Sequence, residues 1–122
     1  MSYLTGRLRS FGNAFRGLKV LVQTQHNARI HAVATLLVVG AGALLRISSV
    51  EWALIVLAIV GVWAAEALNT AVEFVVDLAS PEQHPLAAKA KDVAAAGVLI
   101  AAIGAAIVGG IVFGPHVLRF LK

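Results

Sequence analysis

Residues 52–77, WALIVLAIVGVWAAEALNTAVEFVVD, join a long uncharged run to a narrow row of polar side chains. The polar side chains of this row are Glu66, Asn69, Glu73 and Asp77. At about 100° per residue they fall within about 80° of arc on one helix face. A carboxylate near the bilayer centre costs on the order of 2.5–3.5 kcal/mol, so such a cluster is usually functional. The stretch therefore predicts a transmembrane helix that carries a site, and its oxygen atoms suit a hard cation such as Mg²⁺.

The composition is that of a membrane protein. Hydrophobic residues make up 60% of the 122 residues and charged residues only 13%, about half the share in a soluble domain. Three apolar stretches predict membrane spans at about 29–47, 51–77 and 92–117. Residues 7–25 alternate apolar and basic positions, which predicts an amphipathic helix on the membrane surface. We therefore expect an all-α membrane protein that forms one domain, residues 1–122.

Basic residues predict the orientation of these spans. Seven of the 10 Lys and Arg residues lie before the first span or between the second and third, namely Arg7, Arg9, Arg16, Lys19, Arg29, Lys89 and Lys91. The other three are Arg46, Arg119 and Lys122. Because cytoplasmic loops carry an excess of Lys and Arg, the N-terminus and the second loop are predicted to be cytoplasmic. The same rule and anionic headgroups explain the net charge of +4, and no nucleic-acid-binding signature is present.

Two short segments are predicted to separate the spans. Residues 46–49 predict a tight turn, with Ser49 as the N-cap of the second span. Residues 79–85 contain two prolines, which predict helix ends on both sides of a loop. Small residues of the first and third spans, which predict flat faces with room beside them, include Gly40, Gly42, Gly97 and Ala101.

No standard nucleotide-binding motif is present. The sequence lacks a G-x-x-x-x-G-K-[ST] loop, the protein-kinase motifs and a G-x-G-x-x-G turn between a strand and a helix. A nucleotide would have to be held by Mg²⁺ on the carboxylates and by basic side chains. Lys89 and the pair Lys91-Asp92 offer such side chains at the start of the third span.

The residue pattern leaves other roles open. Glu66 could be buried by a hydrogen bond between subunits, and Asn69 could form a structural bond between helices. The carboxylates nearer the helix end could simply pair with Lys89 or Lys91. Carboxylates at helix spacing also build small proton-coupled transporters, although those need a path through the whole bilayer. A non-catalytic assembly subunit would explain the small residues but not the Lys91-Asp92 pair.

Three motifs resemble the prokaryotic diacylglycerol kinase family, which includes small diacylglycerol kinases and undecaprenol kinases. They are EALNTAVEFVVD at 66–77, HPLA at 84–87 and AKDVAAA at 90–96, and QHNARIH at 25–31 is similar as well. The resemblance implies a homotrimeric enzyme of the bacterial inner membrane. Such an enzyme moves the γ-phosphate of MgATP to the hydroxyl of a membrane lipid alcohol at the cytoplasmic interface.

The resemblance also implies roles for single residues. Glu66 matches the catalytic carboxylate, with Asn69 beside it, and Glu73 matches a metal ligand. Positions around the nucleotide are matched by Glu73, Asp77, Glu82, His84, Lys91, Asp92 and Gln25. Arg29 and His31 join Glu66 as substrate-binding positions.

Two departures from the family pattern affect metal and adenine binding. Gln25 stands where the family commonly has a second carboxylate metal ligand, and an amide oxygen would bind Mg²⁺ more weakly. Asn13 replaces an aromatic residue that often packs near adenine. HPLA at 84–87 and the segment 29–31 look more like the undecaprenol kinase branch. We therefore expect undecaprenol as the acceptor, with diacylglycerol second.

Overall fold

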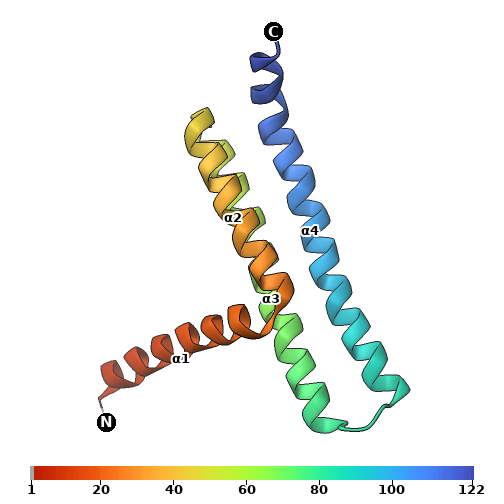
Figure 1. Ribbon diagram of the computed structural model, residues 1–122. Coiled ribbons are helices and arrows are strands. Elements are labelled where there is room, and N and C mark those ends of the chain that lie inside the picture. Colours follow the sequence, from red (N-terminus) through yellow and green to blue (C-terminus); the bar gives the residue numbers. More distant parts are fainter. Residues whose placement is uncertain (1) are drawn as a thin grey trace.

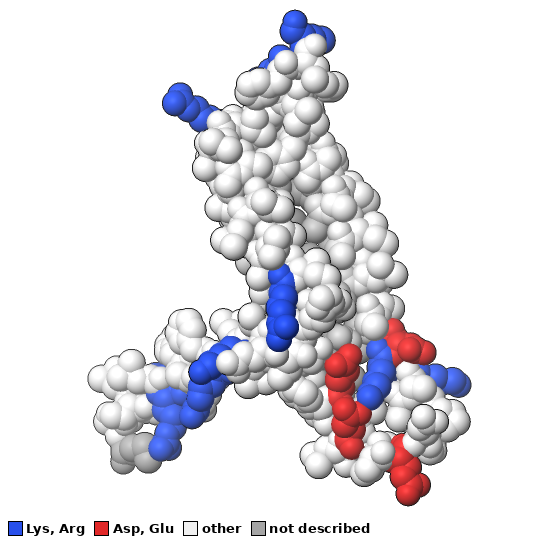
Figure 2. Space-filling model, in the orientation of Figure 1, with Lys and Arg blue, Asp and Glu red and all other residues white. Residues whose placement is uncertain are grey.

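The computed structural model describes residues 2–122, and over these residues the chain is entirely helical (Figure 1). Its helices are α1 (Tyr3–Thr24), α2 (His26–Leu45), α3 (Ser49–Ala79) and α4 (Pro85–Phe120). The prediction of an all-α protein is confirmed. Each of α2, α3 and α4 is long and apolar enough to cross a membrane. Figure 2 shows the matching surface, with Lys and Arg at the upper end of the bundle and along α1, both basic and acidic side chains at the lower end, and a largely uncharged belt between the two ends.

The three long helices form a bundle from which α1 diverges. α3 and α4 run antiparallel and make the most extensive contacts, while α2 packs mainly on α3. Gln25 has extended backbone angles (φ −108°, ψ 118°) and ends the first helix before the second begins. α1 therefore points away from the bundle in Figure 1, and Leu21 is its one buried residue among those described. The predicted membrane-surface role of this helix stays a prediction.

Local capping chemistry moves the helix boundaries from their predicted positions. α1 begins earlier than residue 7, because the Ser2 hydroxyl accepts a hydrogen bond from the Thr5 backbone N–H. The expected N-cap of α3 was wrong, since Ser48 and not Ser49 caps the helix. The Ser48 Oγ accepts from the Glu51 N–H at 3.2 Å, and the Glu51 carboxylate accepts from the Ser48 N–H at 2.7 Å. This capping box satisfies two backbone donors at once.

The fourth helix starts seven residues before the predicted 92, at Pro85. Proline suits a first helical position because its missing N–H would have no intrahelical partner there. The His84 ring caps the same turn, with Nδ1 accepting from the Leu86 N–H at 3.1 Å. With 36 residues, α4 is about 54 Å long, whereas the hydrocarbon core is about 30 Å thick. We therefore expect the first turns of α4, before the apolar stretch at residue 93, to project beyond the hydrocarbon.

The best-packed part of the bundle lies at the end where α2 turns into α3. Ile47, Ile55 and Val112 form a buried cluster there. Arg46 closes the turn in the left-handed conformation (φ 51°, ψ 51°), and Gly42 lies directly against the Trp52 ring. The expectation that Gly42 leaves room for a lipid chain was wrong, because the indole ring fills that space.

Candidate active site

The polar row of α3 passes from the interior of the bundle to its loop end. The side chains of Glu66 and Asn69 are buried, with 1% and 7% of their surface exposed, and Glu73 is half-buried. Asp77 is exposed. Eleven residues separate Glu66 from Asp77, about 16 Å along the helix axis. Glu66 is therefore the deepest carboxylate of the row.

A histidine from α2 meets this deepest carboxylate. His31 Nε2 lies 3.5 Å from Glu66 Oε2. Within residues 2–122, Oε2 is buried and accepts no hydrogen bond. Thr35 Oγ1 donates to the His31 carbonyl oxygen at 2.7 Å, and Trp63 Nε1 donates to Thr35 Oγ1 at 3.0 Å. The structure thus brings together His31 and Glu66, two of the expected substrate-binding positions. The hydrogen bonds through Thr35 and Trp63 connect the backbone at His31 to α3.

Asn69 and Glu73 form the middle of the row. The Asn69 amide donates to Glu73 Oε1 at 3.5 Å, and the amide oxygen of Asn69 is buried without a hydrogen-bond partner among the described residues. Mg²⁺ is commonly held by one or two carboxylates together with substrate phosphates and water. The Glu73 carboxylate, bound only by one long hydrogen bond, fits that chemistry. No group of three or more His, Cys, Asp or Glu side chains within residues 2–122 could hold a metal ion by itself.

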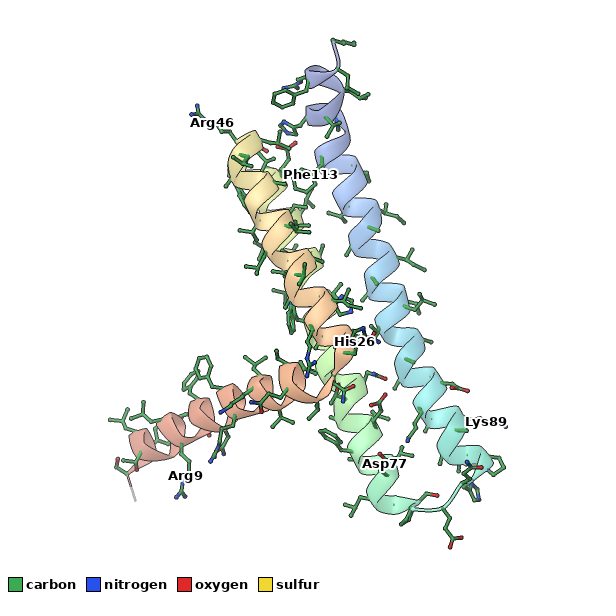
Figure 3. The ribbon with its side chains drawn as sticks, in the orientation of Figure 1. Arg9, His26, Arg46, Asp77, Lys89 and Phe113 are labelled. Atoms are coloured by element: carbon green, nitrogen blue, oxygen red, sulfur yellow. The ribbon has the colours of Figure 1, made fainter. Side chains whose placement is uncertain are left out.

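At the loop end, four of the seven expected nucleotide-binding residues line one cavity. Lys91 Nζ donates to Asp77 Oδ1 at 2.5 Å, which joins the start of α4 to the end of α3. A cavity of about 610 Å³ lies beside this pair, and its lining includes Asp77, Glu82, His84 and Lys91. Figure 3 labels Asp77 and Lys89 at this end, and Figure 2 shows acidic and basic side chains interleaved there.

The ion pair fixes the charge of Lys91. Lys91 precedes the apolar stretch of α4, and the hydrogen bond to Asp77 raises its pKa. Its ammonium group therefore stays protonated at neutral pH, so this end of the site keeps a cation suited to a phosphate. From the sequence, the outer carboxylates of the row could pair with Lys89 or Lys91. The pairing of Asp77 with Lys91 is confirmed.

Three expected site residues are not brought into these clusters. Gln25 lies at the break between α1 and α2, where its amide donates to Thr24 Oγ1 at 3.4 Å. Arg29 donates to the carbonyl oxygens of Val22 and Gln23 at 3.0 and 2.6 Å, and so caps the end of α1. Asp92 is exposed on α4.

Two further cavities meet at His31. One, of about 290 Å³, lies among α2, α3 and α4 and is lined mainly by apolar side chains such as Val38, Ile59 and Ala105. The other, of about 280 Å³, is lined in part by Asn27 and Asn69. His31 therefore borders an apolar space that extends along the bundle and a second, largely apolar space to which Asn27 and Asn69 contribute polar groups.

One ion pair at the opposite end of the bundle was missed from the sequence. His116 Nε2 lies 3.1 Å from Glu51 Oε1, and both side chains are partly buried. Helix geometry could have found it. Glu51 lies 26 residues before Asp77 and His116 lies 25 residues after Lys91, so an antiparallel helix pair that aligns Asp77 with Lys91 also aligns Glu51 with His116.

Comparison with known proteins places the chain in a family. Residues 12–113 match the prokaryotic diacylglycerol kinase family. The chain is 41% identical to the undecaprenol kinase of Bacillus subtilis (strain 168) over 107 residues, which are 88% of this chain and 87% of that protein. It is 42% identical to a diacylglycerol kinase of Synechocystis over 113 residues (92% and 65%), and 33% identical to the diacylglycerol kinase of Escherichia coli K12 over 109 residues (89% and 89%). The chain therefore belongs to the prokaryotic diacylglycerol kinase family and is a lipid kinase, an enzyme that transfers a phosphoryl group to an alcohol.

Proposed function

We propose that this enzyme uses MgATP to phosphorylate the hydroxyl group of a membrane lipid alcohol at the cytoplasmic interface. The observation that carries the proposal is the depth gradient along α3. A buried carboxylate, Glu66, lies at the inner end of the row, and a charged cavity lies at its outer end. A lipid hydroxyl reaches the inner end from the bilayer, whereas a nucleotide reaches the outer end from water.

Glu66 acts as the general base in this proposal. It takes the proton of the lipid hydroxyl while the lipid oxygen forms a bond to the γ-phosphorus. The bond between the γ-phosphorus and its bridging oxygen breaks, and ADP leaves with that oxygen. Asn69 lies one turn away on the same face and helps to position the reacting groups. Such transfers depend mainly on positioning and charge neutralisation.

The outer end holds the nucleotide. Glu73 would hold Mg²⁺, which when bound supplies neutralisation of the phosphate charge. Lys91 offers a cation to a phosphate, while Glu82 and His84 line the same cavity. Gln25 and Asp92 complete the nucleotide end in our proposal, and Gln25 is the second, weaker metal ligand. Gln25 would reach this end by a movement of α1 or from another subunit.

We propose undecaprenol as the acceptor, with diacylglycerol second. The relative that matches over nearly its whole length at 41% identity is an undecaprenol kinase. The apolar cavity beside His31 offers about 290 Å³ lined by small and branched residues. Ala58, Ala102 and Gly109 present little or no side chain to this cavity, which leaves room for part of a branched isoprenoid chain. Arg29, which caps the end of α1, would contact the head group of the lipid substrate.

The proposal also includes a topology and an assembly. The seven basic residues before the first span and in the second loop favour a cytoplasmic N-terminus in the inner membrane. The four Lys and Arg residues of α1 favour contact with anionic headgroups. A homotrimer would cover part of the large apolar surface that one chain exposes. The transporter alternative is not favoured, because the family is one of kinases.

ATP-dependent ³²P transfer to lipids by the purified protein tests the function. Undecaprenol and diacylglycerol are offered in parallel, with and without Mg²⁺, and Glu66→Gln serves as the matched control. We expect a labelled, lipid-extractable product only with wild-type protein, Mg²⁺ and a lipid alcohol. A wild-type protein that labels neither lipid would contradict the proposal.

A further inference from the structure

The buried Glu66 carboxylate has one titratable neighbour within 4 Å among the described residues, His31. The His31 side chain is 19% exposed and the Glu66 side chain 1%. A base can accept a proton only while it is ionised, and burial of an unpaired carboxylate is strongly unfavourable. Some group must therefore stabilise the charge of Glu66, and no other described residue is close enough to pair with it.

The remaining charged groups around this pair are occupied elsewhere. On α1 and α2, the Arg29 guanidinium is bound by the carbonyl oxygens of Val22 and Gln23. On α3, Glu73 lies about two turns from Glu66 and accepts a hydrogen bond from the Asn69 amide. On α4, Lys91 pairs with Asp77. The α4 residues that line the two cavities beside His31 are untitratable: Ala95, Val98, Leu99, Ala102, Ala105, Ala106 and Gly109.

The position of His31 is set by contacts that do not involve Glu66. The Thr35 hydroxyl binds the His31 carbonyl oxygen, and the Trp63 indole binds the Thr35 hydroxyl. This chain of bonds ties α2 to α3 at the level of the pair. The distance of 3.5 Å between Nε2 and Oε2 is long for a hydrogen bond, but catalytic bonds commonly tighten when substrate is bound. A shift of a few tenths of an ångström would suffice.

We propose that His31 is a positioning residue that orients the Glu66 carboxylate for proton abstraction. The proposal deepens the proposed function and rests on the role of Glu66 as base. The Nε2–H of His31 donates to Glu66 Oε2, which leaves Oε1 to accept the proton of the lipid hydroxyl. Glu66 gives that proton up to water after the phosphorylated lipid has left.

The test compares kcat and KM for ³²P transfer by His31→Ala and His31→Gln. Alanine removes the hydrogen-bond donor that faces Glu66, whereas glutamine keeps one. We expect His31→Ala to lower kcat by about 10–100-fold, because the carboxylate loses its orientation, and His31→Gln to recover part of that loss. The KM for ATP should stay unchanged in both variants, because the nucleotide end is not touched.

His116→Ala is the matched control, since it removes the other His–Glu pair at the far end of the bundle. Its kcat should follow the wild type. Added imidazole should restore transfer in His31→Ala, because the removed ring borders two cavities. Restored transfer supports the role of His31. No restoration in a protein of normal helicity overturns it.

The two proposals fail in different ways. An unchanged kcat in His31→Ala, or an equal loss in His116→Ala, removes the role of His31 alone, provided that the wild type is active and Glu66→Gln is not. A wild-type protein without lipid kinase activity, or a fully active Glu66→Gln, removes the proposed function instead.

Discussion

Gly42→Ala is expected to destabilise the bundle although alanine is the better helix former. A Cβ atom at residue 42 would lie 2.8 Å from Cη2 and 3.0 Å from Cζ2 of Trp52, and 3.1 Å from Cδ1 of Ile47. Ordinary contact begins near 3.4 Å, so the indole ring must retreat by about 0.6 Å. Overpacking costs about 1–3 kcal/mol, and the helix propensity of alanine offsets about 0.5–1 kcal/mol. We expect a net loss of about 1–2 kcal/mol in unfolding free energy.

The assay is unfolding in mixed micelles, followed by far-UV circular dichroism as the fraction of denaturing detergent rises. Gly40→Ala on the same helix is the matched control, because nothing lies within 4 Å of its added Cβ atom. This variant should be as stable as the wild type or slightly more so. The two substitutions share the propensity change, so the difference between them isolates the steric contact.

A second change removes the contact from the other side. Trp52→Phe deletes the outer edge of the indole ring, which carries Cζ2 and Cη2. In combination with Gly42→Ala it should recover part of the lost stability, with a coupling of at least about 0.5 kcal/mol. The reasoning is refuted if Gly40→Ala destabilises as much as Gly42→Ala, or if the two changes at residues 42 and 52 are simply additive.

Three further predictions concern activity. Glu66→Gln should lower kcat by about 10²–10⁴ with unchanged helicity, and near-normal turnover would remove Glu66 as the base. Glu73→Gln should raise the Mg²⁺ concentration needed for half-maximal activity and Gln25→Glu should lower it, because each changes the charge offered to the metal. A Mg²⁺ titration that neither variant alters excludes both residues from the metal site. In one bilayer with equal mole fractions of both lipids, undecaprenol should be phosphorylated faster than diacylglycerol. If diacylglycerol is instead phosphorylated faster by roughly tenfold, the assignment of the acceptor is reversed.

Much of the fold follows from properties that act along the chain. Long apolar runs predict spans, and α2, α3 and α4 lie where those runs are. The N-cap of α3 could also have been predicted, although Ser48 and Ser49 offer the same hydroxyl. A capping box needs a glutamate three residues after the cap, and only Ser48 has one, in Glu51.

The site was predictable where it depends on one helix and less so where helices meet. The spacing of Glu66, Asn69, Glu73 and Asp77 gives their common face directly. The partner of Glu66 could not be read in this way, because the register of α2 against α3 depends on the turn at Arg46 and on the packing of Trp52. His31 was expected near the substrate only by family resemblance.

The small number of buried residues has a consequence for how such a sequence can change. The chain exposes 8994 Å², whereas a compact soluble protein of 12.7 kDa exposes about 6,200 Å². Lipid can surround side chains such as Leu36, Leu44 and Leu57, and lipid tails fit any apolar shape. Selection at these positions then preserves only hydrophobicity, and one apolar residue can be replaced by another. In a family whose members are 33% to 42% identical to this chain, we therefore expect the lipid-facing positions to vary most and the few enclosed side chains least.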